Sequence, residues 1–206
     1  MFKQIKNFAI ASATLLPLLP LSTSAELADS KSLYDLAPEG AAFVRIVNVT
    51  DTAFSAEIDG KAVNAAAICG ISEVVWVNEA TALPMTDITV EADTLYTMVL
   101  SESGTSVEQR RAATDPYKAE FATFNLTTDA TVDVVTTQGL RPVFKSVAPG
   151  ASQTRPLNPI TIGLSLMNES MQVDMQEVSL DRGAVTEAFI CGNEDELTFA
   201  LSSYRN

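Results

Sequence analysis

The sequence repeats one strand-and-turn pattern, first at residues 43–51 and again at residues 121–129. In each copy an apolar run ends in Asn, which is followed by one apolar residue, by Thr and, shortly after, by Asp. A further strand-like segment follows both copies. Because repetition within a chain indicates repeated structural units, the pattern predicts two small β-domains in tandem.

Strand signals are dense along the rest of the chain, and helical signals are weak. Residues 54–58 alternate between apolar and polar side chains, and Asp59-Gly60 then turns the chain into a second run, which is typical of a β-hairpin. In the second half, short alternating runs separated by turn residues are typical of a β-sandwich. The sequence therefore predicts an all-β fold of two tandem β-sandwich-like domains joined by a short linker.

Changes in composition along the chain place the domain boundaries. We predict a signal peptide over residues 1–25, an N-terminal β-domain over 26–101, a linker over 102–118 and a C-terminal β-domain over 119–206. The linker is predicted because its first residues are polar and turn-rich and because Asp115-Pro116 ends any helical turn.

The first residues have the organisation of a secretory signal. Lys3 and Lys6 precede an apolar run over residues 8–21, and small residues surround Ala25. We expect cleavage after Ala25, with cleavage after Ala28 as the alternative, and therefore export. A membrane anchor is the other interpretation, but the apolar run is short for a bilayer span and prolines interrupt it.

The chain is strongly acidic. It carries a formal net charge of −13, and removal of residues 1–25, which contain two lysines and no acid, lowers this charge to −15. Such a charge opposes long-range attraction to nucleic acid, anionic lipid or a polyanionic polysaccharide. We therefore expect no nucleic-acid partner and no direct binding of an anionic polymer.

The chain contains no histidine, which removes His-based catalytic triads and His–metal sites. A serine nucleophile would then need lysine as its base, and no Ser-x-x-Lys spacing occurs in the mature chain. Two cysteines without histidine do not complete a zinc site, and the acidic run at residues 194–196 lacks the spacing of a calcium loop. We predict no catalytic residue, no metal and no cofactor, and hence no enzyme.

Two motifs leave alternatives open. Cys69 and Cys191 fall one in each predicted domain, so in an exported protein they form either a disulfide between the domains or two separate thiols. Asn48, Asn125 and Asn168 each begin an Asn-x-Ser/Thr sequon. Two of these sequons belong to the repeated turn, where Asn and Thr side chains bond to the local backbone, so we favour a turn over glycosylation.

The start of the mature chain carries a more specific pattern. Leu33-Tyr34 is followed by Ala37-Pro38-Glu39-Gly40 and by Phe43-Val44-Arg45, with Asn48 at the end of the strand. Through these residues the chain resembles the AlgF family of periplasmic alginate O-acetylation proteins. Further matches extend the resemblance over almost all of the mature chain: Leu95-Tyr96-Thr97, Asn158-Pro159-Ile160, Leu164-Ser165-Leu166 and Leu180-Asp181-Arg182-Gly183. The two cysteines lie outside the family pattern.

The resemblance implies a non-catalytic periplasmic adaptor in alginate biosynthesis. Its implied partners are the periplasmic alginate O-acetyltransferases and a membrane-bound acetyl-donor protein. The alternative is a periplasmic carbohydrate-binding β-sandwich module that presents the polysaccharide. The family-like cluster supplies the predicted partner-docking residues: Tyr34, Pro38, Phe43 and Arg45. The alternative for Tyr34, Pro38 and Phe43 is that they only fasten the first strand to its core.

Overall fold

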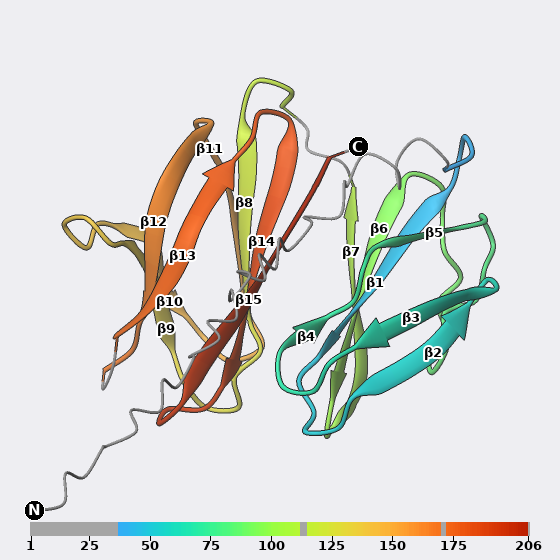
Figure 1. Ribbon diagram of the computed structural model, residues 1–206, viewed down its shortest axis with the longest axis horizontal. Helices are drawn as coiled ribbons and strands as arrows, with labels where there is room; N and C mark the ends of the chain where they lie inside the picture. The colour runs from blue at the N-terminus through green and yellow to red at the C-terminus, as the bar shows by residue number, and fades with distance from the viewer. Residues whose placement is uncertain (1–36, 112–114, 170–171, 206) are drawn as a thin grey trace, which may run out of the picture.

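The computed structural model describes residues 37–111, 115–169 and 172–205, which form two β-domains side by side (Figure 1). The regular elements among these residues are all strands. This confirms the predicted all-β fold with two tandem sandwich-like domains. The predicted signal peptide and Tyr34 lie outside the described residues.

The N-terminal domain consists of a mixed sheet covered on one face by a hairpin. Its strands are β1 (Ala42–Asn48), β2 (Phe54–Ile58), β3 (Lys61–Ala65), β4 (Gly70–Ile71), β5 (Val75–Val77), β6 (Thr94–Ser101) and β7 (Gly104–Arg111). The sheet has the order β4-β1-β6-β7, and β5 also pairs with β1. The β2–β3 hairpin, predicted from Asp59-Gly60, packs its apolar side chains against this sheet.

The C-terminal domain is a β-sandwich of two four-stranded sheets. Its strands are β8 (Ala119–Asn125), β9 (Val132–Thr136), β10 (Pro142–Val147), β11 (Ser152–Leu157), β12 (Ile160–Met167), β13 (Gln172–Leu180), β14 (Ala184–Gly192) and β15 (Leu197–Arg205). One sheet has the order β10-β9-β12-β13 and the other β11-β8-β14-β15. Phe121, Phe144, Leu164 and Leu166 belong to the buried core between these sheets.

The sequence repeat corresponds to a structural repeat. β1 pairs in parallel with β6, which pairs antiparallel with β7, and strands β8, β14 and β15 repeat this arrangement. The register agrees as well, because Asn48 lies opposite Leu100 and Asn125 lies opposite Ile190. Each domain therefore contains one copy of the same three-stranded unit.

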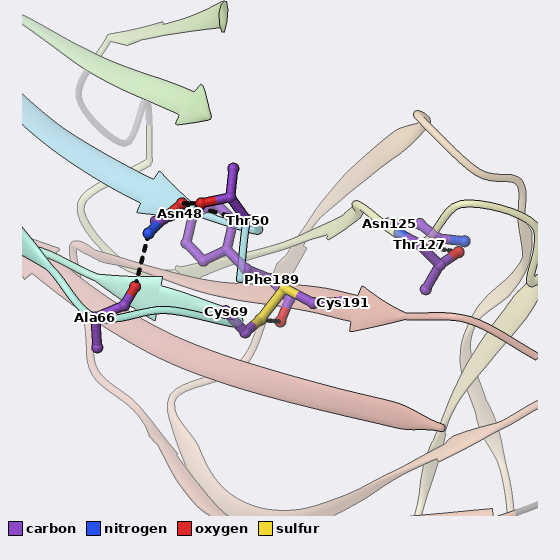
Figure 2. Close-up of a disulfide and its surroundings, with 8 residues drawn as sticks. All are labelled: Asn48, Thr50, Ala66, Cys69, Asn125, Thr127, Phe189 and Cys191. Carbon is purple, nitrogen blue, oxygen red and sulfur yellow. Dashed lines mark hydrogen bonds between the residues drawn. A yellow bond between two sulfur atoms is a disulfide. The ribbon is translucent and has the colours of Figure 1, made fainter. Parts of the chain in front are cut away.

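The Asn of the first repeat fixes the end of β1 (Figure 2). Asn48 donates from Nδ2 to the carbonyl oxygens of Thr52 at 2.7 Å and Ala66 at 3.0 Å. Its Oδ1 accepts from the backbone N–H of Thr50 at 3.1 Å and from the Thr50 hydroxyl at 2.8 Å. One side chain thus joins the strand end to the turn that follows it and to the segment after β3.

The second repeat makes the same bonds. Asn125 donates from Nδ2 to the carbonyl oxygens of Ala130 at 2.7 Å and Val147 at 2.8 Å, and its Oδ1 accepts from the backbone and hydroxyl of Thr127. Asn48 and Asn125 are both fully buried. The first two sequons are therefore turn motifs whose amide groups are committed to the fold, as the turn interpretation predicted.

Replacing Asn125 by Ala should lower the free energy of unfolding by about 3 kcal/mol, because buried backbone groups lose their partners. Asn125→Asp should cost a similar amount, since a carboxylate cannot donate to the two carbonyl oxygens. Urea unfolding followed by circular dichroism measures both effects. Asn168→Ala, at a half-buried position, is the control and should cost much less. An unchanged urea midpoint for Asn125→Ala would contradict this role.

One boundary predicted from the sequence is wrong. Residues 104–111, assigned to the linker, form β7 and pair with β6 from Gly104 opposite Ser101 to Arg111 opposite Thr94. The polar segment before them is the tight turn of a hairpin, in which the Ser101 hydroxyl donates to the Gly104 carbonyl at 2.9 Å. β7 lies at the edge of its sheet and has a polar outer face, so its composition is that of a loop. The connection between the domains is therefore shorter than predicted, and residues 112–114 of it lie outside the described residues.

Candidate functional site

The two repeated units pack against each other and form the junction between the domains. β1 alternates between two environments: Val44 and Ile46 contact the hairpin-side core, while Phe43, Arg45 and Val47 face the C-terminal domain. This central strand is buried on both faces, which explains why its apolar run is nearly continuous.

Apolar side chains from both domains fill most of the junction. Val47 and Val99 of the N-terminal domain contact a cluster with Ala122, Phe124 and Phe189 of the C-terminal domain. The rings of Phe124 and Phe189 stack with their centroids 5.0 Å apart. Burial of this surface favours association of the two domains by the hydrophobic effect.

Arg45 lies fully buried in the middle of this apolar junction. Its Nε donates to Thr97 Oγ1 at 2.9 Å, its Nη1 donates to Ser202 Oγ at 2.8 Å, and its Nη2 forms an ion pair with Glu187. The guanidinium carbon also lies 4.8 Å from the centroid of the Phe189 ring. Such a combination of a carboxylate, hydroxyls and an aromatic face is what a buried guanidinium needs to offset its desolvation.

The Arg45–Glu187 pair continues into a chain of charges that crosses the junction. Arg110 Nε lies 3.1 Å from the second carboxylate oxygen of Glu187, and Arg110 Nη1 lies 2.6 Å from Glu120 Oε1. Arg110 also donates to Thr154 Oγ1 at 3.0 Å. Both arginines belong to the N-terminal domain and both glutamates to the C-terminal domain, so every one of these ion pairs joins the two domains.

The two repeated units differ at the positions that form the Arg45–Glu187 ion pair. Counted from the repeated Asn, Arg45 of the first unit corresponds to Ala122 of the second. Thr97 lies opposite Arg45, and Glu187 lies opposite Ala122, so Thr97 and Glu187 are also equivalent positions. Two otherwise equivalent units therefore carry a cation on one and an anion on the other. This difference favours pairing between the two domains over pairing of either domain with a copy of itself.

A disulfide closes one end of the junction (Figure 2). Cys69, which follows β3, is bonded to Cys191 of β14, with 5.7 Å between the Cα atoms and 122 residues of sequence separation. The Cys69 sulfur lies 3.5 Å from the carbonyl oxygen of Phe189, beside the stacked rings. Of the two alternatives that the sequence left open, the structure has the bridge between the domains.

Two of the predicted docking residues are part of the junction instead. Arg45 was assigned to a docking surface, and this is wrong, because the side chain is fully buried against Glu187. Phe43 is half-buried and packs against a cluster that includes Val185 and Tyr204 of the C-terminal domain. For Phe43, the alternative of fastening the first strand to its core agrees with this packing.

The other two predicted docking residues lie elsewhere. Pro38 is exposed near the start of β1, and Tyr34 lies outside the described residues. Sequence reasoning did not single out Glu187 or Arg110. The available signal was a lone charge inside an otherwise apolar strand, present both at Arg45 and at Glu187.

Potential metal-ligating side chains are dispersed over the described residues. No group of three or more Cys, Asp and Glu side chains within residues 37–111, 115–169 and 172–205 is placed to hold a metal ion. Both cysteines are in the disulfide. In the same part of the chain, no helix has the length and apolarity needed to cross a bilayer.

Comparison with known proteins gives the family. Residues 16–187 match the family model described as "Alginate O-acetyl transferase AlgF". The chain belongs to the AlgF family. The resemblance seen at Leu33-Tyr34, Pro38 and Phe43-Val44-Arg45 is thereby confirmed.

Relatives named alginate biosynthesis protein AlgF align over most of their length. The protein from Pseudomonas aeruginosa is 27% identical over 193 residues, covering 87% of this chain and 86% of the relative. The protein from Azotobacter vinelandii is 28% identical over 189 residues, covering 85% and 84%. A solved structure of the C-terminal domain of AlgF from P. aeruginosa is 27% identical and covers 43% of this chain and 99% of that one, with a TM-score of 0.39.

Proposed function

We propose that the protein is a non-catalytic periplasmic adaptor of the alginate O-acetylation machinery. It holds periplasmic alginate O-acetyltransferases together with a membrane-bound acetyl-donor protein. The observation that carries this proposal is the junction, in which a disulfide, a buried ion pair and an apolar cluster all join the two domains. A body whose domains are fixed in this way can present two outer surfaces at a constant separation, which is what an adaptor requires.

The chemistry of the chain supports a non-catalytic role. Acetyl transfer needs an activated nucleophile, and the sequence has no histidine to activate a serine. The cysteines are bonded to each other, and the Glu187 carboxylate is held between Arg45 and Arg110. The word transferase in the family description is therefore best applied to the acetylation system in which these proteins act.

Periplasmic location is part of the proposal. The predicted signal peptide over residues 1–25 accounts for export. A disulfide between domains is stable in an oxidising compartment and rare in a reducing one, so the Cys69–Cys191 bridge supports the same assignment.

A carbohydrate-binding module remains the second candidate, and the aromatic side chains favour the adaptor over it. Sugar-binding surfaces use exposed aromatic faces. Of the large apolar side chains that are exposed among the described residues, one is aromatic, and it is Tyr117. Trp76 is half-buried, and the Lys61 ammonium lies 3.5 Å from its ring centroid, so one face of the indole is already covered.

Two measurements on the purified mature protein test the proposal. Calorimetric titration with the purified periplasmic alginate O-acetyltransferase of the same organism should give saturable binding. Incubation with p-nitrophenyl acetate or acetylated oligomannuronate should release no more acetate than buffer does. Acetate release that scales with protein concentration, or the absence of binding to the acetyltransferase, would overturn the adaptor function.

A further inference from the structure

Charge is unevenly distributed over the C-terminal domain. The chain has 26 acidic residues, yet residues 134–168 contain no Asp or Glu. The same segment contains Arg141, Lys145 and Arg155. In a chain with a net charge of −13, this is a long stretch of purely positive character.

The fold brings these three cations to one side of the sandwich. β10 and β11 are the edge strands of the two sheets, and they lie next to each other. Arg155 of β11 donates from Nη1 to the Val143 carbonyl of β10 at 2.9 Å, and Gln153 donates to the Lys145 carbonyl at 3.2 Å. Arg141 lies two residues before Val143. We call Arg141, Lys145 and Arg155 the cationic edge.

The cationic edge is available to a partner. All three side chains are exposed. The ion pairs among the described residues use Arg45, Lys61 and Arg110, and none uses a residue of the cationic edge. Asp133 directly precedes the acid-free segment, and its Oδ1 accepts a hydrogen bond from the backbone N–H of Ser146 at 2.6 Å.

Two exposed apolar side chains belong to the same acid-free segment as the cations. Leu140 is 44% exposed and directly precedes Arg141, while Ile160, which is 55% exposed, opens the strand after β11. Leu140 also has a φ of 46°, in the left-handed region that costs a leucine energy, although its side chain gains little burial in return. Arginine is enriched at protein–protein interfaces relative to the rest of the surface, and exposed apolar side chains add surface that a partner can bury.

We propose that the cationic edge, together with Leu140 and Ile160, is the docking surface for an acidic face of a periplasmic protein partner. This inference rests on the proposed adaptor function and assigns a surface to it. Edge strands commonly carry charges and prolines that block pairing with other sheets, and Pro142 and Pro156 serve that purpose here. Charge of either sign would block pairing, so that purpose alone does not explain three cations without one carboxylate.

A protein partner fits this surface better than an anionic polysaccharide does. A long polyanion would extend beyond the cationic edge onto the acidic remainder of the protein and be repelled there, whereas a protein face can match the size of the edge. A polyuronate also presents hydroxyls and carboxylates, which do not cover Leu140 and Ile160. An acidic protein face with aliphatic side chains satisfies both features.

The test uses variants matched in net charge. In the test variant Arg141, Lys145 and Arg155 are all replaced by Gln. The control variant carries three exposed substitutions in the N-terminal domain that change the net charge by the same amount: Ala53→Glu, Ala62→Glu and Thr89→Glu. A double variant, Arg141→Gln/Lys145→Gln, retains the Arg155 hydrogen bond to β10. Circular dichroism and the thermal midpoint establish that each variant is folded.

The probe is the purified periplasmic alginate O-acetyltransferase of the same organism, titrated at low and at physiological ionic strength. We expect the triple Gln variant to bind at least about tenfold more weakly and with a smaller salt dependence, while the matched control binds like the wild type. Leu140→Ser/Ile160→Ser should weaken binding without altering the salt dependence.

Three results would overturn the inference, and they can be told apart. If the triple Gln variant binds like the wild type, the cationic edge is not the docking surface and the adaptor function stands. If the wild type does not bind the acetyltransferase at all, the adaptor function fails and this surface loses its proposed partner. If the wild type binds oligomannuronate and the triple Gln variant does not, the edge is a polyuronate site.

Discussion

Replacing Glu187 by Ala is expected to lower the free energy of unfolding by about 4 kcal/mol, because it leaves the guanidinium of Arg45 buried without its carboxylate. Arg45 has no exposed surface through which water could replace the lost charge. The substitution also removes one of the carboxylates that hold Arg110. The loss should therefore exceed that of an ordinary surface ion pair several times over.

Urea unfolding with the disulfide intact measures this effect. The control is Glu120→Ala, which removes a partly exposed partner of Arg110 and should cost about 1 kcal/mol or less. A double variant, Arg45→Met/Glu187→Leu, should recover most of the loss, since removing both charges also removes their desolvation. A loss below that of Glu120→Ala would show that the pair does not hold the domains together.

Removing the disulfide should have an effect of similar size. The bond spans 122 residues, and the chain-entropy model assigns about 4 to 5 kcal/mol to a loop of roughly that length. The double variant Cys69→Ala/Cys191→Ala should therefore unfold at a clearly lower urea concentration than the oxidised wild type. Reduction of the wild type supplies an independent comparison, because it breaks the same bond without changing the side-chain carbon atoms.

The two treatments should agree with each other. We expect the reduced wild type and the Cys69→Ala/Cys191→Ala variant to have the same urea midpoint, below that of the oxidised protein. If the oxidised wild type and the variant unfold at the same midpoint, the bridge contributes nothing to stability. The junction would then depend on its ion pair and apolar cluster alone.

Local sequence patterns predicted the local features of the fold. The Asp59-Gly60 hairpin could be predicted because turn residues and alternation occupy adjacent positions. The repeat and its Asn turns could be predicted because the side chain bonds within a few residues of itself. β7 was missed because an edge strand with a polar outer face has the composition of a linker.

The junction could not be predicted in the same way. Arg45 and Glu187 meet across the two domains, and nothing adjacent to either residue in sequence indicates the other. Arg45 was assigned to a docking surface because it belongs to the family-like cluster, and arginine is mostly exposed in folded proteins. The disulfide remained an open alternative for the same reason, because sequence does not give the distance between two Cα atoms 122 residues apart.

The most direct test of the adaptor account is the acetyl content of alginate from a strain that lacks the gene. Polymer yield and acetyl groups per uronate are measured in the wild type, the deletion strain and the deletion strain complemented with the full chain. The account predicts unchanged polymer yield, loss of acetyl groups and their restoration by the full chain. Normal acetylation of the polymer in the deletion strain would contradict it.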